Sequence, residues 1–424
     1  MSSRFFLALL LLLSGCASTA PAERSAVAPA LVEEIKPRLE SLRGLDFRAP
    51  VPIDIKSRAE MQADFVRQLA EDYGDDGLAK LSLAYGKLGL IPEKADLKKA
   101  LLQFYTAEVV AYYDIRTKRL VLPDRSAGAG EEIQVVVAHE LTHALQAQHF
   151  PVVDRLSKTS DDDGDIALQA IVEGDATLSG YAYIGAGAKE LSVLGPAMEA
   201  DMQNPPSGVR DVPQALIEEM FFPYYAGVGF LAPILAAGGW KDVDAVYSAP
   251  PLSTEQILHP EKYFTDPDPP TRIDFGDLAA FFPADWKEIE NNVLGEFMTR
   301  VLFEQHLSKD DAKTAAEGWD GDRFVAYGHG AEVAFVWASI WDSQSDAEEF
   351  VEAYLRLAAK RSPGAYAYVE RRGPQALVVE GLDRARVAGA VEKVWRELKM
   401  KEEPFTPPRF GAAKPTPAAW LVAP

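Results

Sequence analysis

The sequence predicts an α+β fold, with a helix-dominated first region followed by a smaller region of mixed helices and strands. In residues 31–272, apolar side chains mostly recur at the three- and four-residue spacing of amphipathic helices. In residues 273–401, short β-rich runs bounded by turn residues indicate strands between helices. The chain has 424 residues, 48% of them hydrophobic, which is enough for two or three domains with a sizeable core.

The elements of the first region follow from local patterns. Ser57 with Glu60 three residues later is a capping box, which indicates the start of a helix. The stretch 51–55 alternates as a short strand does, and the β-rich pieces 109–113 and 119–122 flank a polar turn, which indicates a hairpin. The helices expected in this region are 31–43 with an interruption near Pro37, 57–73, 77–88, 94–110, 131–149, 165–184 with Asp165 as its N-cap, 213–221, 226–237, 241–247 and 254–258.

The second region is expected to alternate helices and strands. The helices are predicted at 285–306, 310–316, 345–360 and 383–398, and the strands at 322–327, 333–340, 366–370 and 375–380. Two segments are expected to be irregular. Residues 185–215 are rich in glycine and proline, and the Pro- and Ala-rich tail 402–424 should be poorly ordered.

The N-terminus has the pattern of a targeting segment. A short cationic start precedes the apolar stretch 5–13, which is too short to span a bilayer, and residues 13–16 read Leu-Ser-Gly-Cys. This pattern resembles the lipobox of bacterial lipoproteins, in which the cysteine is lipidated. The resemblance implies a signal peptide at 1–15, then lipidated Cys16 and a tether at 16–30. It places the protein in the bacterial cell envelope, anchored to a membrane through lipid, and Ala17 favours the outer membrane.

Charge and cysteine content narrow the function classes. The net charge is −21, which argues against nucleic acid as a partner because phosphate-binding surfaces need clustered Lys and Arg. Cys16 is the sole cysteine, so an exported fold must be stable without an internal disulfide. No later segment is predicted to span a membrane.

The chemistry is concentrated in His139-Glu140-Leu141-Thr142-His143. Residues four apart project from one helix face, so His139 and His143 can bind one metal ion, and Glu140 beside them can act on a metal-bound water. Neither proline nor glycine interrupts residues 131–149, which favours a continuous helix. The spacing is the H-E-x-x-H signature of zinc peptidases, although a core helix with two structural histidines would carry the same letters.

A catalytic zinc needs a third protein ligand, and two residues compete for the role. On a continuous helix His149 lies about 9 Å along the axis from His143 and on another face, so it can bind only if the helix breaks at Gln146. Glu173 lies in a second expected helix, after an acidic loop that lets the chain reverse. An antiparallel helix can bring its carboxylate to the metal, and the small Gly174 and Ala176 permit close approach. We therefore predict His139, His143 and Glu173 as zinc ligands, with Asp175 as a supporting residue.

The run HELTHALQAQHF followed by EGDA at 173–176 resembles the gluzincins, zinc metallopeptidases with a glutamate as third ligand. The segments STEQILHPEKY and AAEGWDGDRF extend a similarity to bacterial lipoproteins that have a zincin core. The resemblance implies a zincin-like core at 31–272, a zinc-activated water, and a peptide or protein substrate paired along an upstream edge strand. Thermolysin-like gluzincins place an aspartate where this chain has Thr177, so the groups supporting the ligands should differ.

The resemblance also implies roles for individual side chains. Glu140 would be the general base, and His259 is a candidate to stabilise the oxyanion, since it lies downstream of Glu173 as in thermolysin-like enzymes. His259 could equally be structural, because Ser253 caps a helix before it. Tyr181, Tyr183 and Tyr225 are alternatives that the sequence does not rank. The acidic run 161–165 lacks the spacing of a calcium loop, and the aromatic run 221–225 is expected to be core.

One reading from a different class stays open. The chain could be a non-catalytic envelope lipoprotein that binds or assembles other components and retains a zinc site. The intact Glu140 favours the enzyme, because a structural zinc site does not need a base. Structural sites also usually close all four positions with Cys or His, and the chain has no second cysteine. The partner of residues 273–401 is not indicated by any motif.

Overall fold

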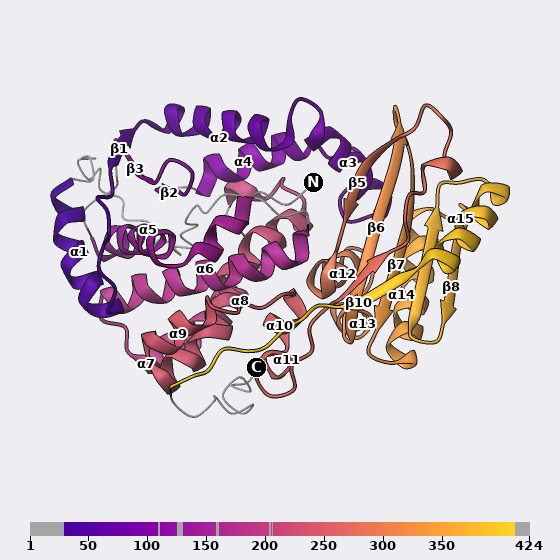
Figure 1. Ribbon diagram of the computed structural model, residues 1–424. Helices are drawn as coiled ribbons and strands as arrows, with labels where there is room; N and C mark the ends of the chain where they lie inside the picture. The colour runs from indigo at the N-terminus through magenta and orange to yellow at the C-terminus, as the bar shows by residue number, and fades with distance from the viewer. Residues whose placement is uncertain are drawn as a thin grey trace.

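A computed structural model describes residues 29–108, 111–124, 130–157, 161–202, 205 and 207–411 and shows an α+β protein (Figure 1). The predicted signal peptide, Cys16 and most of the tether lie outside the described residues. The helical region occupies one side of the molecule in Figure 1, and the larger sheet occupies the other.

Helices dominate the first region. Three of them, α5 (Glu131–His149), α6 (Asp162–Tyr183) and α8 (Gln214–Gly238), form its centre, with α6 contacting both α5 and α8. The remaining helices are α1 (Pro29–Arg43), α2 (Arg58–Tyr73), α3 (Gly77–Leu88), α4 (Leu97–Glu108), α7 (Ala188–Asp201), α9 (Trp240–Val246), α10 (Thr254–Leu258) and α11 (Glu261–Phe264), with 3-10 turns at Pro151–Ser157 and Ser207–Val209.

A small sheet lies beside α5. Its strands are β1 (Ile53–Lys56), β2 (Tyr112–Asp114) and β3 (Arg119–Pro123), in the order β1-β3-β2. Strand β3 runs parallel to β1 and antiparallel to β2, which confirms the predicted hairpin and makes β2 an edge of this sheet. The capping box is also present, since Ser57 Oγ accepts from the N–H of Glu60 while the Glu60 carboxylate accepts from the N–H of Ser57.

The second region is built on an antiparallel sheet in the order β5-β6-β7-β9-β8. One face packs on α12 and α14, and the other packs on α15 and the segment around Phe275 and Phe282. Its elements are β4 (Thr271–Asp274), a 3-10 turn (Ala279–Phe281), β5 (Lys287–Asn292), α12 (Gly295–Glu304), α13 (Lys309–Ala316), β6 (Trp319–His329), β7 (Glu332–Trp341), α14 (Gln344–Arg361), β8 (Ala367–Arg372), β9 (Gln375–Glu380), α15 (Arg384–Glu397) and β10 (Lys399–Glu402).

One hydrophobic core continues from the helical region into the sheet region. Phe222 of α8 stacks on Phe297 of α12 with ring centroids 3.9 Å apart. Polar groups join the same elements, because Thr254 Oγ1 donates to Asp163 at the start of α6 and accepts from the N–H of Phe297 at 3.1 Å. The first turns of α6 and α12 are therefore held together through α10.

Two differences from the expected helices, at α7 and α8, occur where the chain contains proline. The prediction of a loose segment at 185–215 missed α7, which contains Pro196, and the predicted helices 213–221 and 226–237 are one helix, α8, with Pro223 and Pro233 inside it. Proline removes a helical hydrogen bond, but the extensive burial of α8 compensates for that loss. The expected helix 285–306 is wrong over its first part, because 287–292 form β5.

The expectation of a poorly ordered tail from Glu402 is also wrong for its described part. Strand β10 pairs antiparallel with β4, and residues 403–411 then run back over the helical region (Figure 1). Phe405 packs on Tyr263 and Phe410 packs on Phe264, with ring centroids 5.3 Å apart in both pairs. Two aromatic side chains thus fix a segment whose composition indicates disorder.

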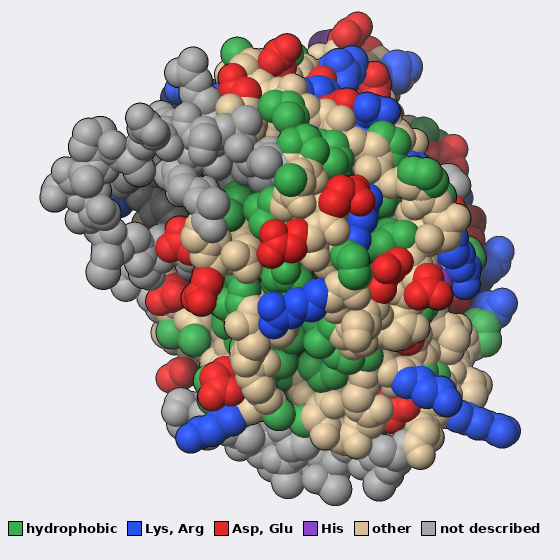
Figure 2. Space-filling model, turned by 90° about the vertical axis from the view of Figure 1, so that its left-hand side faces the viewer, with side chains coloured by type: hydrophobic (Ala, Val, Ile, Leu, Met, Phe, Trp, Pro, Cys, Tyr) green, Lys and Arg blue, Asp and Glu red, His purple; other side chains and the backbone are tan. Residues whose placement is uncertain are grey.

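Helix α8 has the length and hydropathy needed to cross a membrane, contrary to the expectation that no later segment does. In this structure 67% of its most apolar window is buried within the protein, as in the core helix of a globular protein. The face of the molecule nearest α1 and α7 is shown in Figure 2, where hydrophobic side chains gather between charged ones. A groove between α1, α6, α7, α8 and α9 is lined by apolar side chains, among them Leu42, Leu191, Leu235 and Trp240.

Candidate metal centre

Helix α5 presents the H-E-x-x-H residues inside the protein. It spans the predicted residues, carries Glu131 and Glu132 in its first turn where acidic groups favour a helix N-terminus, and ends at His149, two residues before Pro151. His139, Glu140 and His143 are 0%, 0% and 2% exposed. Buried ionisable groups need specific partners, so what surrounds these three side chains decides what they can do.

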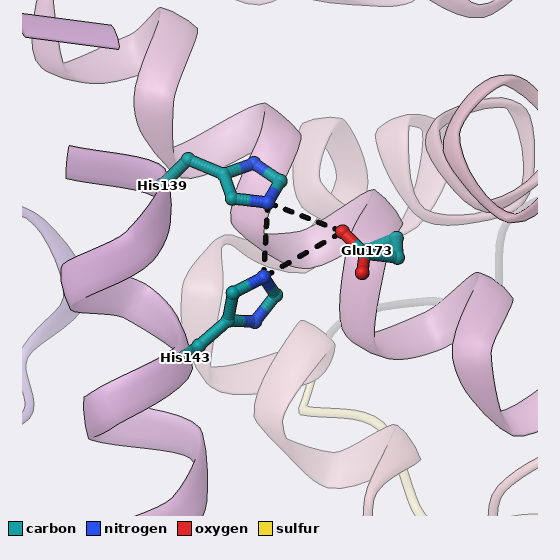
Figure 3. A group of neighbouring side chains, drawn as sticks. All are labelled: His139, His143 and Glu173. Carbon is teal, nitrogen blue, oxygen red and sulfur yellow. Dashed lines mark hydrogen bonds and ion pairs between the residues drawn. The ribbon is translucent and has the colours of Figure 1, made fainter. Parts of the chain in front are cut away.

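The structure brings Glu173 of α6 to the two histidines (Figure 3). Its Oε2 lies 3.1 Å from Nε2 of His139 and 3.5 Å from Nε2 of His143, and the two Nε2 atoms are 2.9 Å apart. Three ligand atoms of one tetrahedral zinc lie about 3.4 Å from one another, given bonds of about 2.0–2.2 Å. The donor set and its spacing therefore fit a zinc ion.

The charges of the cluster favour one proton shared within it. Burial lowers the pKa of His139 to about 4, even though Glu173 opposes this shift. Burial also works against charge on His143, but Glu173 and Glu140 outweigh it and raise its pKa to about 9. Without metal, the additional proton of the pair therefore lies on His143, whose Nε2 is 2.9 Å from Nε2 of His139. A metal ion would replace that proton.

Glu140 lies next to the cluster and is held by the small sheet. Its Oε2 accepts a hydrogen bond of 2.7 Å from the backbone N–H of Tyr113 in β2. This N–H points away from β3 and toward α5, so the free edge of β2 binds the Glu140 carboxylate directly. The hairpin thus fixes the orientation of Glu140 beside the two histidines.

Tyr224 of α8 completes the surroundings of the cluster. Its ring stacks on His139 with centroids 6.2 Å apart and planes 18° from parallel, and it is hydrogen-bonded to Glu173. Burial and the negative charges of Glu173 and Glu140 raise its pKa well above the usual value, so the phenol keeps its proton. Tyr224 was not predicted as a site residue, because four of the five residues in the run 221–225 are aromatic and the helical phase does not show which ring faces α6.

Two glycines bring α6 and α8 close together at this site. A Cβ built on Gly174 would lie 2.6 Å from the carbonyl oxygen of Gly227, and one on Gly227 would lie 2.7 Å from the carbonyl carbon of Ala170. Gly174 follows Glu173 directly in the chain, and Gly227 lies one turn after Tyr224. The glycines therefore set how closely Tyr224 approaches the cluster.

The other predicted residues lie elsewhere. His149 remains on the continuous helix α5, and its Nε2 is 2.8 Å from the carbonyl oxygen of Asp46. His259 is not brought to the cluster, which corrects its proposed catalytic place. Its Nε2 is 2.9 Å from Glu296, next to α10, and α10 contacts the start of α6 through Asp163. Glu173 lies ten residues after Asp163 on α6, which is about 15 Å along the helix axis at about 1.5 Å per residue.

The remaining acidic groups have internal partners. Glu255, Asp268 and Asp342 surround the ammonium of Lys262, which occupies the place that a metal ion would take. In the run 161–165, Asp161 caps α6 instead of the expected Asp165 and pairs with Arg272, while Asp163 accepts from Thr254. Within the part of the chain that the structure describes, His139, His143 and Glu173 therefore form the one well-formed candidate metal site.

Comparison with known proteins bears on the second region only. Residues 283–392 match a family described as a domain of unknown function, DUF8575. This segment runs from just before β5 into α15 and contains none of the residues of the metal cluster. No curated protein and no solved structure matches the chain.

Proposed function

We propose that this protein is a zinc-dependent metallopeptidase with a gluzincin-type, zincin-like core. The observation that carries the proposal is the convergence of His139, His143 and Glu173, with the carboxylate of Glu140 beside them. His₂Glu is a donor set of catalytic zinc sites, which leave a position for water. A structural zinc site would not need the neighbouring carboxylate.

The chain's own groups have complementary roles in this proposal. Zinc in such a site lowers the pKa of a water molecule to about 7 and polarises a carbonyl group. Glu140, oriented by the N–H of Tyr113, accepts the proton of the attacking water and later delivers it to the leaving amine. Tyr224, which keeps its proton and lies against Glu173 and His139, replaces His259 as the donor for the developing oxyanion.

The edge strand β2 supports a peptide as substrate. It is one of the two edge strands of the small sheet, and the N–H of Tyr113 on its free edge already donates to Glu140. An extended peptide that pairs with such an edge gains main-chain hydrogen bonds whatever its sequence. Because Glu140 already uses the N–H of Tyr113, a peptide substrate would pair with the remaining main-chain groups of this edge.

The non-catalytic alternative has one observation in its favour. All three ligand residues and Glu140 are at most 3% exposed, as in a zinc site that stabilises a fold. Only a comparison of zinc binding with peptide cleavage separates the two functions.

Lipid anchoring at Cys16 in the bacterial envelope is part of the proposal as well. Metabolic labelling with a fatty acid should be lost in Cys16→Ser and retained in the wild-type protein.

The test uses Glu140→Gln, whose amide oxygen can still accept from Tyr113. Zinc content and cleavage of a denatured-protein or peptide library are measured for both proteins, with the lipid removed by Cys16→Ser. We expect Glu140→Gln to keep zinc and lose cleavage. The matched control Glu132→Gln changes an exposed glutamate of the same helix and should keep both. Equal cleavage by Glu140→Gln would refute the role of Glu140, and a wild-type protein that binds no metal would refute the zinc site.

A further inference from the structure

We propose that Gln146, Asp175 and Arg43 form a positioning relay that orients His143 for metal binding. The inference rests on the proposed zinc site and adds residues to it that are not metal ligands. The relay crosses four helices, from α5 through α6 to α1 and α9, and each of its side chains is buried.

The first link sets the orientation of the imidazole. Nδ1 of His143 is 2.8 Å from Oε1 of Gln146. The amide cannot be turned over without loss, because its Nε2 donates to the carbonyl oxygen of Val172 and to Oδ2 of Asp175, both at 2.9 Å. Oε1 must therefore face His143, and Nδ1 must carry the donated proton. This arrangement directs the lone pair of the other ring nitrogen, Nε2, to the cluster whenever a metal is bound.

The second link holds Asp175 in place. Its carboxylate accepts a hydrogen bond of 2.8 Å from the hydroxyl of Tyr247 and forms an ion pair of 2.8 Å with Arg43. Arg43 is itself fixed by an ion pair of 2.6 Å with Asp244 and by stacking on Trp240. A guanidinium that is buried with two carboxylates has little freedom to move, so α1 and α9 hold the acceptor of Gln146 rigidly.

The two histidines proposed as ligands differ in the hydrogen bonding of their second ring nitrogen, Nδ1. Among the described residues, Nδ1 of His139 has no hydrogen-bond partner, and neither has the hydroxyl of Thr177, one turn after Glu173 on α6. The relay therefore supports His143 alone. Its loss should weaken metal binding, because removing a hydrogen-bonding partner of a metal-bound histidine typically costs about 10- to 100-fold in affinity.

The test measures zinc affinity by competition with a chelator in the full-length chain, together with the visible absorption spectrum of the cobalt-loaded protein. Gln146→Met keeps the volume of the side chain and removes both links. We expect its zinc affinity to fall about 10- to 100-fold, with a changed cobalt spectrum. The control is Gln148→Met, at a residue of the same helix whose side chain hydrogen-bonds to Arg48 and Ala49. It should change neither the zinc affinity nor the cobalt spectrum.

A second variant separates positioning from folding. In Gln146→Glu with Asp175→Asn, the new carboxylate still accepts from His143 and the new amide donates to it, but the hydrogen bond to the carbonyl oxygen of Val172 and the ion pair with Arg43 are lost. We expect the zinc affinity of this variant to lie between those of the wild type and Gln146→Met, because the acceptor for His143 is kept while two of the contacts that position it are lost. Zinc binding by Gln146→Met equal to wild type would overturn the relay and leave the zinc site standing. No zinc binding by the wild-type chain would overturn the site, and the relay with it.

Discussion

The contact between α6 and α8 yields a sharp prediction, because two glycines at the crossing control the position of Tyr224. Gly227→Ala would place a methyl group 2.7 Å from the carbonyl carbon of Ala170 and closer still to its oxygen. Both neighbours are helix backbone and cannot rotate away. The two helices must therefore separate, and Tyr224 must move away from Glu173 with α8.

The expected cost follows from the depth of the overlap. Carbon and backbone atoms pack at about 3.5–4.0 Å, so the crossing has to open by more than about 1 Å, since the oxygen of Ala170 is closer than its carbon. Overpacking of this kind costs about 1–3 kcal/mol and sometimes more, and the buried backbone contact favours the upper end of the range, about 3 kcal/mol. With an unfolding entropy of about 2.1 cal/mol/K per residue, this cost lowers the Tm by about 3–4 °C.

The assay is thermal and urea unfolding of Gly227→Ala beside Gly229→Ala. A Cβ on Gly229, on the same helix, would meet nothing within 4 Å. Gly229→Ala should therefore be neutral or stabilising by up to about 1 kcal/mol, since alanine favours a helix over glycine. Wild-type stability in Gly227→Ala, or equal destabilisation by the two variants, would refute the close crossing of the helices.

Three further predictions follow from the site and the tail. Zinc binding at pH 7 should release about one proton, because the pKa of His143 is raised to about 9 by Glu173 and that of His139 is lowered to about 4. Calorimetry in buffers of different ionisation enthalpy measures this release, and zinc affinity should weaken as the pH falls below 9; a pH-independent affinity would contradict it. His259→Phe should retain zinc and lower the Tm, because it leaves the buried Glu296 without its partner, and slower turnover at an unchanged Tm would restore the catalytic role. Phe405→Ala should cost about 1–2 kcal/mol in unfolding free energy through lost packing on α11, and an unchanged Tm would mean that the tail is not docked.

The local elements could be predicted where one strong signal was sufficient. The helix 131–149 was predicted with its observed bounds because neither glycine nor proline interrupts it. The capping box at Ser57 and the hairpin before α5 likewise depend on neighbouring residues. Glu173 was singled out because a third ligand is needed, a second helix can bring its carboxylate to the metal, and the run EGDA resembles that of the gluzincins.

Elements whose stability comes from distant contacts were predicted wrongly. Pro223 and Pro233 indicated a break, yet burial on several sides keeps α8 in one piece. The strand 287–292 is defined by its pairing with β6, and nothing in its own composition reveals that partner. The tail after Glu402 is ordered by aromatic rings more than a hundred positions earlier in the chain.

The candidate site shows the same division. The spacing of His139, Glu140 and His143 along one helix is a local property, so the sequence alone establishes that these groups share a face and predicts metal chemistry. Asp175 was expected as a supporting residue, but its partners, and the places of Tyr224, Gln146 and Arg43, were decided only in the folded chain. Each acts through a contact between helices, and the helical period of one segment says nothing about which face of another segment it will meet. The two glycines at the α6–α8 crossing and the buried ion pairs of Arg43 determine these contacts between helices.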